Sequence, residues 1–160
     1  MQLEPIGIVH SPFSSQSGTP VQPACAGRAA VGTVEVYERF AEGLDDLEGF
    51  ERIWLIVWFD RVGPVRMKVV PYLDTHQRGL FATRAPSRPN PIGISPVRLL
   101  RREGRILHVT ELDILDGTPL LDIKPYSRSF DVFTVTRNGW LDGQEPQSRR
   151  EADDRFAPDS

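Results

Sequence analysis

Short runs of alternating apolar and polar residues recur along the chain, and clusters of Gly, Pro, Ser and Asp separate them. A period of two is typical of strands that have one buried face. The sequence predicts strands over 3–10, 29–37, 65–70, 79–83, 95–102, 105–112, 120–123 and 132–136. Residues 52–59 (RIWLIVWF) are almost wholly apolar and rich in β-branched and aromatic side chains, so they predict a central buried strand.

Two segments depart from this strand pattern. Phe40, Leu44 and Leu47 recur at helical spacing among acidic residues, which predicts a short amphipathic helix over 38–50. Residues 14–27 are rich in Ser, Gly, Pro, Ala and Gln and show no periodicity, so they predict a loop. At fourteen residues this loop is longer than most connections, and loops of that length are often functional.

Strands at short intervals with turns between them favour a closed or nearly closed antiparallel barrel. The Glu103-Gly104 pair between two predicted strands indicates a hairpin. We therefore expect a mainly β protein: a single-domain, mostly antiparallel β-barrel with one or two short helices. The barrel domain is expected over 1–140, followed over 141–160 by a polar C-terminal tail that is either frayed or in contact with a partner.

Composition narrows the class of protein. The 160 residues suffice for one domain with its own core, and the 13 Gly and 14 Pro argue against a helical bundle. No apolar run approaches the ~20 residues of a membrane-spanning helix, and the N-terminus lacks a secretory signal, so we expect a soluble, cytoplasmic protein with no membrane partner. The single cysteine excludes an internal disulfide, and three dispersed histidines predict no metal site.

Charge is distributed in blocks that the net value of −3 conceals. Residues 63–105 carry a net charge of +7, whereas 1–62 and 106–160 carry −5 each. A basic middle is suited to a surface that faces a polyanion. Arginines that point to solvent and pair with acids elsewhere give the same pattern, and charge alone favours this second interpretation.

The first of two unusual stretches is 83–95 (TRAPSRPNPIGIS), which has three prolines within six residues. Prolines at this density force a stiff, extended path, so Arg84 and Arg88 are presented from a rigid loop. Rigid placement suits a guanidinium that grips a carboxylate or a phosphate. A plain stiffened turn explains the composition equally well. Gly93 permits a close approach of the backbone.

The second stretch is 112–126 (LDILDGTPLLDIKPY), in which an Asp-Gly-Thr-Pro turn lies between two apolar runs. Backbone groups of such a turn are free to bind a ligand at the end of a sheet. Asp113 and Asp122 flank the turn, and Lys124 and Tyr126 follow it. Taken alone, this stretch favours a plain hairpin turn.

Together these stretches, with IGIVHSPF (6–13) and FERIWLIVWF (50–59), resemble the TsaA-like family (TrmO, YaeB or VirR-type) over about residues 4–136. The resemblance implies an S-adenosylmethionine-dependent methyltransferase built on a β-barrel, and the absence of a GxGxxG loop agrees with this. It also implies that tRNA is the substrate, methylated at N6 of threonylcarbamoyl-adenosine at position 37 of the anticodon loop. A homodimer with its cofactor pocket near the subunit interface is implied as well.

Carried over residue by residue, the cofactor contacts of the family fall on Pro20, Val21, Gln22, Asp60, Arg61, Arg84, Ile114, Leu115, Asp116 and Gly117. An arginine can hold the methionine carboxylate, the turn backbone can bind the adenine edge, and Leu115 can cover the adenine ring. Arg88, Asn90 and Lys124 are expected to bind the RNA substrate, which would make binding sensitive to salt.

Methyl transfer is a direct displacement that depends on positioning, and the N6 nitrogen must lose a proton to an acceptor. Asp116 is the first catalytic candidate, with Asp122 and Tyr126 behind it. For the latter two, a buried hydrogen-bonded pair near a strand end is an equally weighted interpretation. Family members that act on tRNA carry other residues in place of Val21 and of Asp60-Arg61. These differences keep open a barrel that binds S-adenosylmethionine without transferring its methyl group, or a methyltransferase for a small molecule or another RNA.

Overall fold

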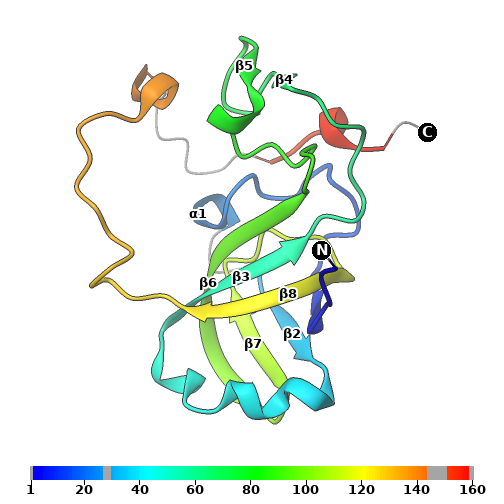
Figure 1. The fold of residues 1–160 in the computed structure, drawn as a ribbon, viewed down its shortest axis with the longest axis vertical. Helices are drawn as coiled ribbons and strands as arrows, with labels where there is room; N and C mark the ends of the chain where they lie inside the picture. Colours follow the sequence, from blue (N-terminus) through cyan, green and yellow to red (C-terminus); the bar gives the residue numbers. More distant parts are fainter. Residues whose placement is uncertain (1, 27–29, 144–150, 159–160) are drawn as a thin grey trace.

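Six strands of the computed structural model, which describes residues 2–26, 30–143 and 151–158, close into a barrel (Figure 1). Their order around the barrel is β1-β2-β7-β6-β3-β8, and every neighbouring pair is antiparallel. The strands are β1 (Gly7–His10), β2 (Gly32–Val36), β3 (Arg52–Trp58), β6 (Ile92–Glu103), β7 (Ile106–Thr110) and β8 (Thr118–Pro125). The expected antiparallel barrel is therefore confirmed.

The barrel core follows from the period-two pattern. Along β3, Ile53, Leu55 and Val57 are completely buried, while the residues between them are only partly buried. The predicted hairpin forms between β6 and β7, where Gly104 adopts the left-handed conformation that suits glycine. Inward-facing residues of all six strands fill the interior. They include Val9, Val34, Val36, Val97, Leu99, Leu107, Val109 and Leu120.

The predicted α-helix over 38–50 is wrong in detail. The segment forms two 3₁₀ stretches, η1 (Glu38–Leu44) and η2 (Leu47–Gly49), which run across one end of the barrel (Figure 1). Asp46 between them has a left-handed backbone with φ 65°, which interrupts any regular helix. Leu44 and Leu47 are nevertheless buried against the barrel core, so the pattern identified the inward-facing residues correctly.

Three further strand predictions hold only in part or not at all. Within 65–70 and 79–83, only β4 (Lys68–Val69) and β5 (Arg78–Gly79) overlap the expected strands, and Leu80–Ala82 form the 3₁₀ stretch η3 instead. The predicted strand over 132–136 is wrong, because this segment is an arm that pairs with no strand of the described chain. Alternation reports a face but cannot supply a neighbouring strand.

Several short elements gather at the end of the barrel opposite η1 and η2 (Figure 1). They are the β4-β5 pair, η3, the four-residue helix α1 (Pro23–Ala26) inside the predicted loop, η4 (Gly139–Gly143) and η5 (Asp154–Phe156). A small second core of Val69, Leu80, Ala85 and Phe156 joins β4, η3 and η5. None of the described helices is long and apolar enough to cross a membrane.

Part of the predicted tail packs back onto this end. The Ala152 amide donates to the carbonyl of Thr19 over 2.7 Å, and Pro20 forms an isolated bridge with Glu151. The Phe156 ring packs edge-on against Tyr72 with centroids 5.2 Å apart. Residues 151–158 therefore help to build the loops above the barrel, whereas 144–150 lie outside the described residues.

Candidate functional site

A cleft of about 690 Å³ opens between the barrel end and the elements above it. Its walls come from several parts of the chain: the first loop, the end of β3, the β4-β5 connection, η3 and the loop after it, the start of β6, the connection between β7 and β8, and Ala152. Trp140 and Leu141 of η4 close one side. Cofactor pockets commonly have volumes of ~300–1,000 Å³, so the cleft can enclose a nucleoside-sized ligand.

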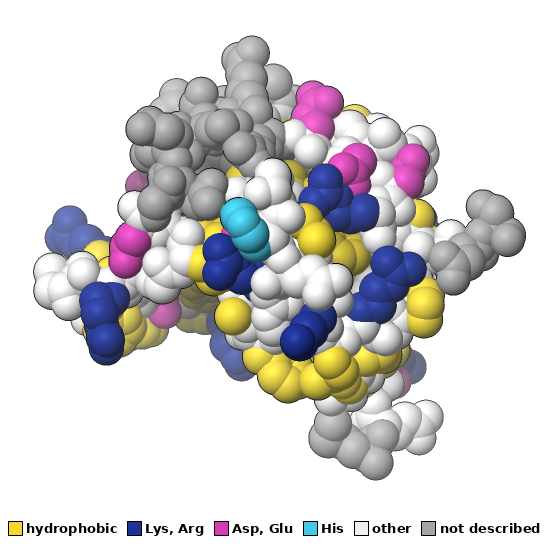
Figure 2. All heavy atoms as spheres, turned by 90° about the horizontal axis from the view of Figure 1, so that it is seen from above, with side chains coloured by type: hydrophobic (Ala, Val, Ile, Leu, Met, Phe, Trp, Pro, Cys, Tyr) yellow, Lys and Arg dark blue, Asp and Glu magenta, His cyan; other side chains and the backbone are white. Residues whose placement is uncertain are grey.

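Most of the residues that the family resemblance assigned to a cofactor line this one cleft. They are Pro20, Val21, Gln22, Asp60, Arg61, Arg84 and Leu115, and the candidate substrate residue Arg88 also lines it. Figure 2 looks onto this end of the molecule, where Lys and Arg side chains lie among apolar ones. The fold thus gathers segments that are up to ninety-five positions apart in sequence.

The turn over 114–117 lies beside the cleft but is tied mainly to β1. Ile114 is buried in the barrel core, and the positive φ of Gly117 (76°) explains the glycine there. The Asp116 carboxylate accepts a hydrogen bond from the Ser11 amide over 3.0 Å. The backbone carbonyl of Asp116 accepts one from the Arg61 guanidinium over 2.6 Å. Arg61 therefore couples the end of β3 to this turn.

The other sequence-predicted residues lie away from the cleft lining. Asp122 forms a salt bridge of 2.7 Å with Lys124 on β8. Tyr126 follows β8 at its far end, with its ring 5.6 Å from that of Trp54. Asp122 and Tyr126 do not form the buried hydrogen-bonded pair that was one interpretation of them. Asn90 is exposed in the loop before β6.

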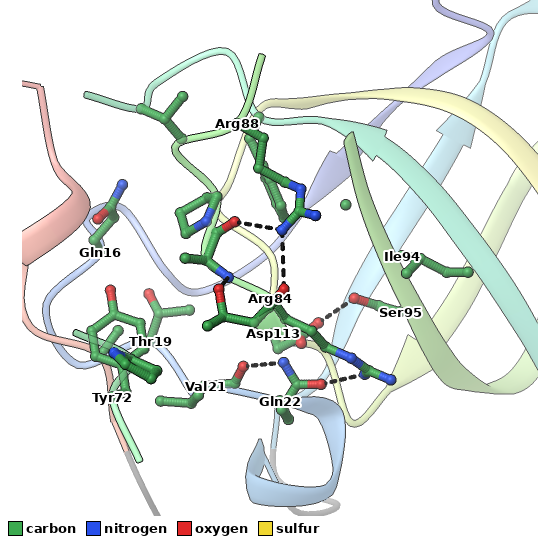
Figure 3. A pocket seen from close by; sticks show the side chains of 18 of the residues that line it. Gln16, Thr19, Val21, Gln22, Tyr72, Arg84, Arg88, Ile94, Ser95 and Asp113 are labelled. Atoms are coloured by element: carbon green, nitrogen blue, oxygen red, sulfur yellow. Dashed lines mark hydrogen bonds between the residues drawn. The ribbon is translucent and has the colours of Figure 1, made fainter. Parts of the chain in front are cut away.

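The two arginines of the proline-rich loop differ in their contacts. Arg88 donates from Nη1 to the carbonyls of Thr83, Ala85 and, at the 3.5 Å limit, Leu80, so it holds the loop closed. Arg84 donates to the Gln22 amide oxygen over 2.7 Å (Figure 3). It forms no salt bridge with any residue that the structure describes, so its positive charge remains uncompensated in the cleft.

The sequence did not single out Asp113 and Ser95 as site residues, yet both line the cleft. The Ser95 hydroxyl donates to the Asp113 carboxylate over 2.7 Å (Figure 3). Burial raises the pKa of Asp113 to about 7, while the Ser95 hydrogen bond and the positive charge of Arg84 act in the opposite direction. The sequence did contain one signal for Asp113: it is an acidic residue between Leu112 and Ile114, two apolar residues that are buried in the structure.

Two further features of the lining are unusual. Gln16 donates to the carbonyls of Arg61 and Phe156, but its buried Oε1 has no hydrogen-bond partner among the described residues. A Cβ at Gly93 would lie 2.3 Å from the Phe59 ring, so only glycine lets that ring pack against β6 and form a cleft wall. The group that approaches the backbone closely at Gly93 is thus the Phe59 side chain.

Comparisons with known proteins agree with this geometry. The chain is 51% identical over 150 residues to a probable S-adenosyl-L-methionine-binding protein of Pyrococcus abyssi, covering 94% of this chain and 81% of that protein. It is 35% identical to the human tRNA (adenine(37)-N6)-methyltransferase, covering 80% of this chain but only 30% of the human protein.

A crystal structure of TrmO from Pseudomonas aeruginosa superposes with a TM-score of 0.73 and 39% sequence identity. The match covers 88% of this chain and 62% of that one, so the chain spans less than two thirds of the solved protein. The family model described as the tRNA-methyltransferase O N-terminal domain matches residues 8–132. With most of its length matched, the chain belongs to the family of this N-terminal domain.

Proposed function

We propose that the protein binds S-adenosylmethionine in the cleft and transfers its methyl group to N6 of the modified adenosine at position 37 of tRNA. The observation that carries the proposal is the convergence of seven candidate cofactor residues on one cleft of about 690 Å³. The names of the archaeal and human relatives supply the ligand and the substrate.

The chemistry of the lining fits each part of this cofactor. Arg84, which has no salt bridge in the described chain, suits the methionine carboxylate. Leu115 and Phe59 offer apolar walls to the adenine ring. The buried Oε1 of Gln16, which has no hydrogen-bond partner in the described part of the chain, would accept a hydrogen bond from an N–H or O–H group of the ligand. Asp113 offers a carboxylate to the cationic part.

In this mechanism the bound cofactor supplies an activated methyl group, and the chain contributes positioning and proton transfer. Asp116 is the proposed proton acceptor for N6, because its exposed carboxylate lies on the turn beside the cleft. Asp122 and Tyr126 lie along the outside of β8. A role for them requires RNA that extends from the cleft across β8, or a second copy of the chain.

The homodimer is part of the proposal, and two apolar surfaces support it. The arm over 126–138 extends away from the barrel as irregular chain (Figure 1). Its Phe130, Val132, Phe133 and Val135 side chains are 61–77% exposed. The outer face of the β3-β6 pair carries Trp54, Ile56 and Trp58 opposite Pro96, Ile94 and Ile92. We propose that the arm of one copy covers this face of the other.

Sedimentation equilibrium tests this arrangement. Phe133→Ser is expected to shift the protein toward the monomer, whereas Leu100→Ser, at the other end of β6, is expected to leave the dimer unchanged. A monomeric wild-type protein at all concentrations would contradict the dimer without affecting cofactor binding.

The proposed reaction is tested by incubating the purified protein with methyl-labelled S-adenosylmethionine and tRNA, followed by nucleoside analysis. Label in the N6-methylated form of threonylcarbamoyl-adenosine is the expected result. Cofactor binding without label in tRNA would support the second candidate, a binding barrel, which the name of the Pyrococcus relative favours. No binding of the cofactor, with or without tRNA, would contradict both functions.

A further inference from the structure

Asp113 lines the cleft together with Arg84 and Leu115. It is adjacent in sequence to the 114–117 turn, to which the proposed function assigns the adenine end of the cofactor. Arg84, to which it assigns the methionine carboxylate, acts electrostatically on the same carboxyl group. In S-adenosylmethionine the sulfonium joins the methionine part to the nucleoside part. Because Asp113 lines the same cleft as Arg84 and Leu115, its carboxyl group is available to the cationic centre that joins the two parts.

The carboxylate of Asp113 has little compensation within the protein. The Ser95 hydroxyl donates to it over 2.7 Å and its own backbone amide also donates, while Arg84 is directed to the amide oxygen of Gln22 rather than to Asp113 (Figure 3). No salt bridge to Asp113 exists among the described residues. Because a charge that is largely removed from water and has no ion-pair partner is unfavourable, these surroundings favour the neutral acid.

Other charged groups face the cleft from each surrounding element but are already engaged. Asp60 and Arg61 after β3 pair with each other over 3.3 Å, and Arg88 is held by backbone carbonyls. Burial raises the pKa of Tyr72 to about 12, so this phenol is neutral near pH 7. Arg84 is the charged neighbour that lowers the pKa of Asp113, and burial outweighs it.

We infer that Asp113 is the counter-charge to the ligand's sulfonium, and that it becomes charged by losing its proton when this cation enters the cleft. The inference rests on the proposed function and deepens it. The demethylated product, S-adenosylhomocysteine, is a neutral thioether at the same atom. Asp113 then regains a proton from solvent, so the site distinguishes cofactor from product by charge, and the product is held less tightly.

Calorimetric titration at pH 7 in phosphate and in Tris, whose ionisation enthalpies differ, measures the protons released on binding. About half a proton per S-adenosylmethionine is expected, because a group with a pKa near 7 is half protonated at that pH. S-adenosylhomocysteine is expected to release none. Between pH 6 and pH 8, the affinity for S-adenosylmethionine should rise about tenfold, while that for S-adenosylhomocysteine stays constant.

Three variants sharpen the test. Asp113→Asn should abolish the proton release and the pH dependence, and it should lower the affinity for S-adenosylmethionine about tenfold toward that for S-adenosylhomocysteine. Ser95→Ala removes the donor that favours the charged form, so the affinity profile should shift to higher pH. Asp45→Asn is the matched control, since this exposed carboxylate pairs with Arg102 at the other end of the barrel.

The outcomes separate the two proposals. Absence of S-adenosylmethionine binding at every pH, with or without tRNA, would overturn the proposed function. Binding without proton release, or equal release with both ligands, would overturn only the role of Asp113, and equal release would point to the ammonium group that both share. If Asp113→Asn fails to fold in a thermal melt, the direction of the Ser95→Ala shift decides.

Discussion

The two ends of the barrel differ in how many of their basic side chains have an acidic partner. At the η1-η2 end, every arginine of β6 and its hairpin has an acidic partner: Arg98 with Glu51, Arg101 with Glu103, Arg102 with Asp45, and Arg105 with Glu35. At the cleft end, Arg78 pairs with Asp74, but Arg66, Lys68, Arg84 and Arg88 form no salt bridge with a described residue. One basic block in sequence is thus divided between two surfaces.

This difference shows why charge alone did not decide between the two interpretations of 63–105. Arginines paired across strands are a solvated surface, and exposed pairs contribute only ~0–1 kcal/mol each to stability. Arginines around a cleft that bond to neutral groups and have no acidic partner keep a net positive charge there, which suits an anionic ligand. The paired arginines confirm the solvated-surface interpretation for the η1-η2 end, whereas a surface that faces a polyanion stays a prediction for the cleft end.

Replacing one arginine at each end tests this difference with the largest expected effect. Arg84→Ala should weaken S-adenosylmethionine binding by about 10–150-fold, the range for losing a hydrogen bond to a charged group. The free energy of unfolding should stay nearly unchanged, because Arg84 is exposed and its hydrogen-bond partner in the described part of the chain is Gln22. Arg101→Ala is the control and should leave binding intact. Calorimetry of both variants measures the effect, and equal losses in both would refute the division of roles.

The two glycines of β6 and its hairpin provide a second contrast. Gly93→Ala should cost about 1–3 kcal/mol of stability, because the new Cβ collides with Phe59, and cofactor affinity should fall with it. Gly104→Ala should cost about 1–2 kcal/mol through its positive φ alone, and affinity should not change. Chemical denaturation and calorimetry measure the two quantities. A Gly93→Ala variant with full affinity would show that Phe59 does not shape the site.

How far the sequence predicts this molecule is clearest from particular residues. The apolar run over 52–59 correctly identified β3, the alternation over 29–37 correctly identified β2, and the Glu103-Gly104 turn correctly identified a hairpin, because all three are local patterns. Residues 132–136 show the same alternation without forming a strand, because pairing requires a neighbour that no local pattern supplies.

Sequence motifs predicted some residues of the candidate site. They did not predict the residues whose properties depend on burial in the folded chain. Arg84 and the 20–22 loop came from the family resemblance, and they line the cleft. Asp113 was visible only as a residue flanking a turn, because its raised pKa depends on apolar neighbours from other segments. Trp140 was missed since its hydrogen bond to the Ala82 carbonyl spans 58 positions of the chain.

Stability against pH gives a third test of the difference between the ends. Because burial raises the pKa of Asp113 from 3.8 to about 7, the folded state binds this proton more tightly than the unfolded state does. Its contribution to the free energy of unfolding should fall by up to about 1.4 kcal/mol per pH unit between pH 4 and pH 7. Asp113→Asn should lack this decline, and Asp45→Asn should retain it. Urea unfolding at several pH values measures it, and parallel curves for wild type and Asp113→Asn would contradict the buried carboxyl.

The smallest expected effect concerns RNA. Arg66→Ala and Lys68→Ala should each reduce the slope of log affinity for tRNA against log salt by about 0.7–0.9, as expected when one phosphate contact is lost. Arg101→Ala should not alter the slope, because this arginine is already paired with Glu103. Filter binding over a salt series measures the slope. A salt-independent affinity in the wild-type protein would argue for a small-molecule substrate.

The central claim is that one end of the barrel is the ligand-binding end, and hydrogen–deuterium exchange with and without S-adenosylmethionine tests it most directly. The ligand is expected to slow exchange in 14–26, 59–62, 83–95 and 113–118, the segments that carry most of the cleft lining. Exchange in 38–51 and 100–107, at the other end, should not change. Protection at that other end, or none in the cleft segments at saturating ligand, would contradict the account.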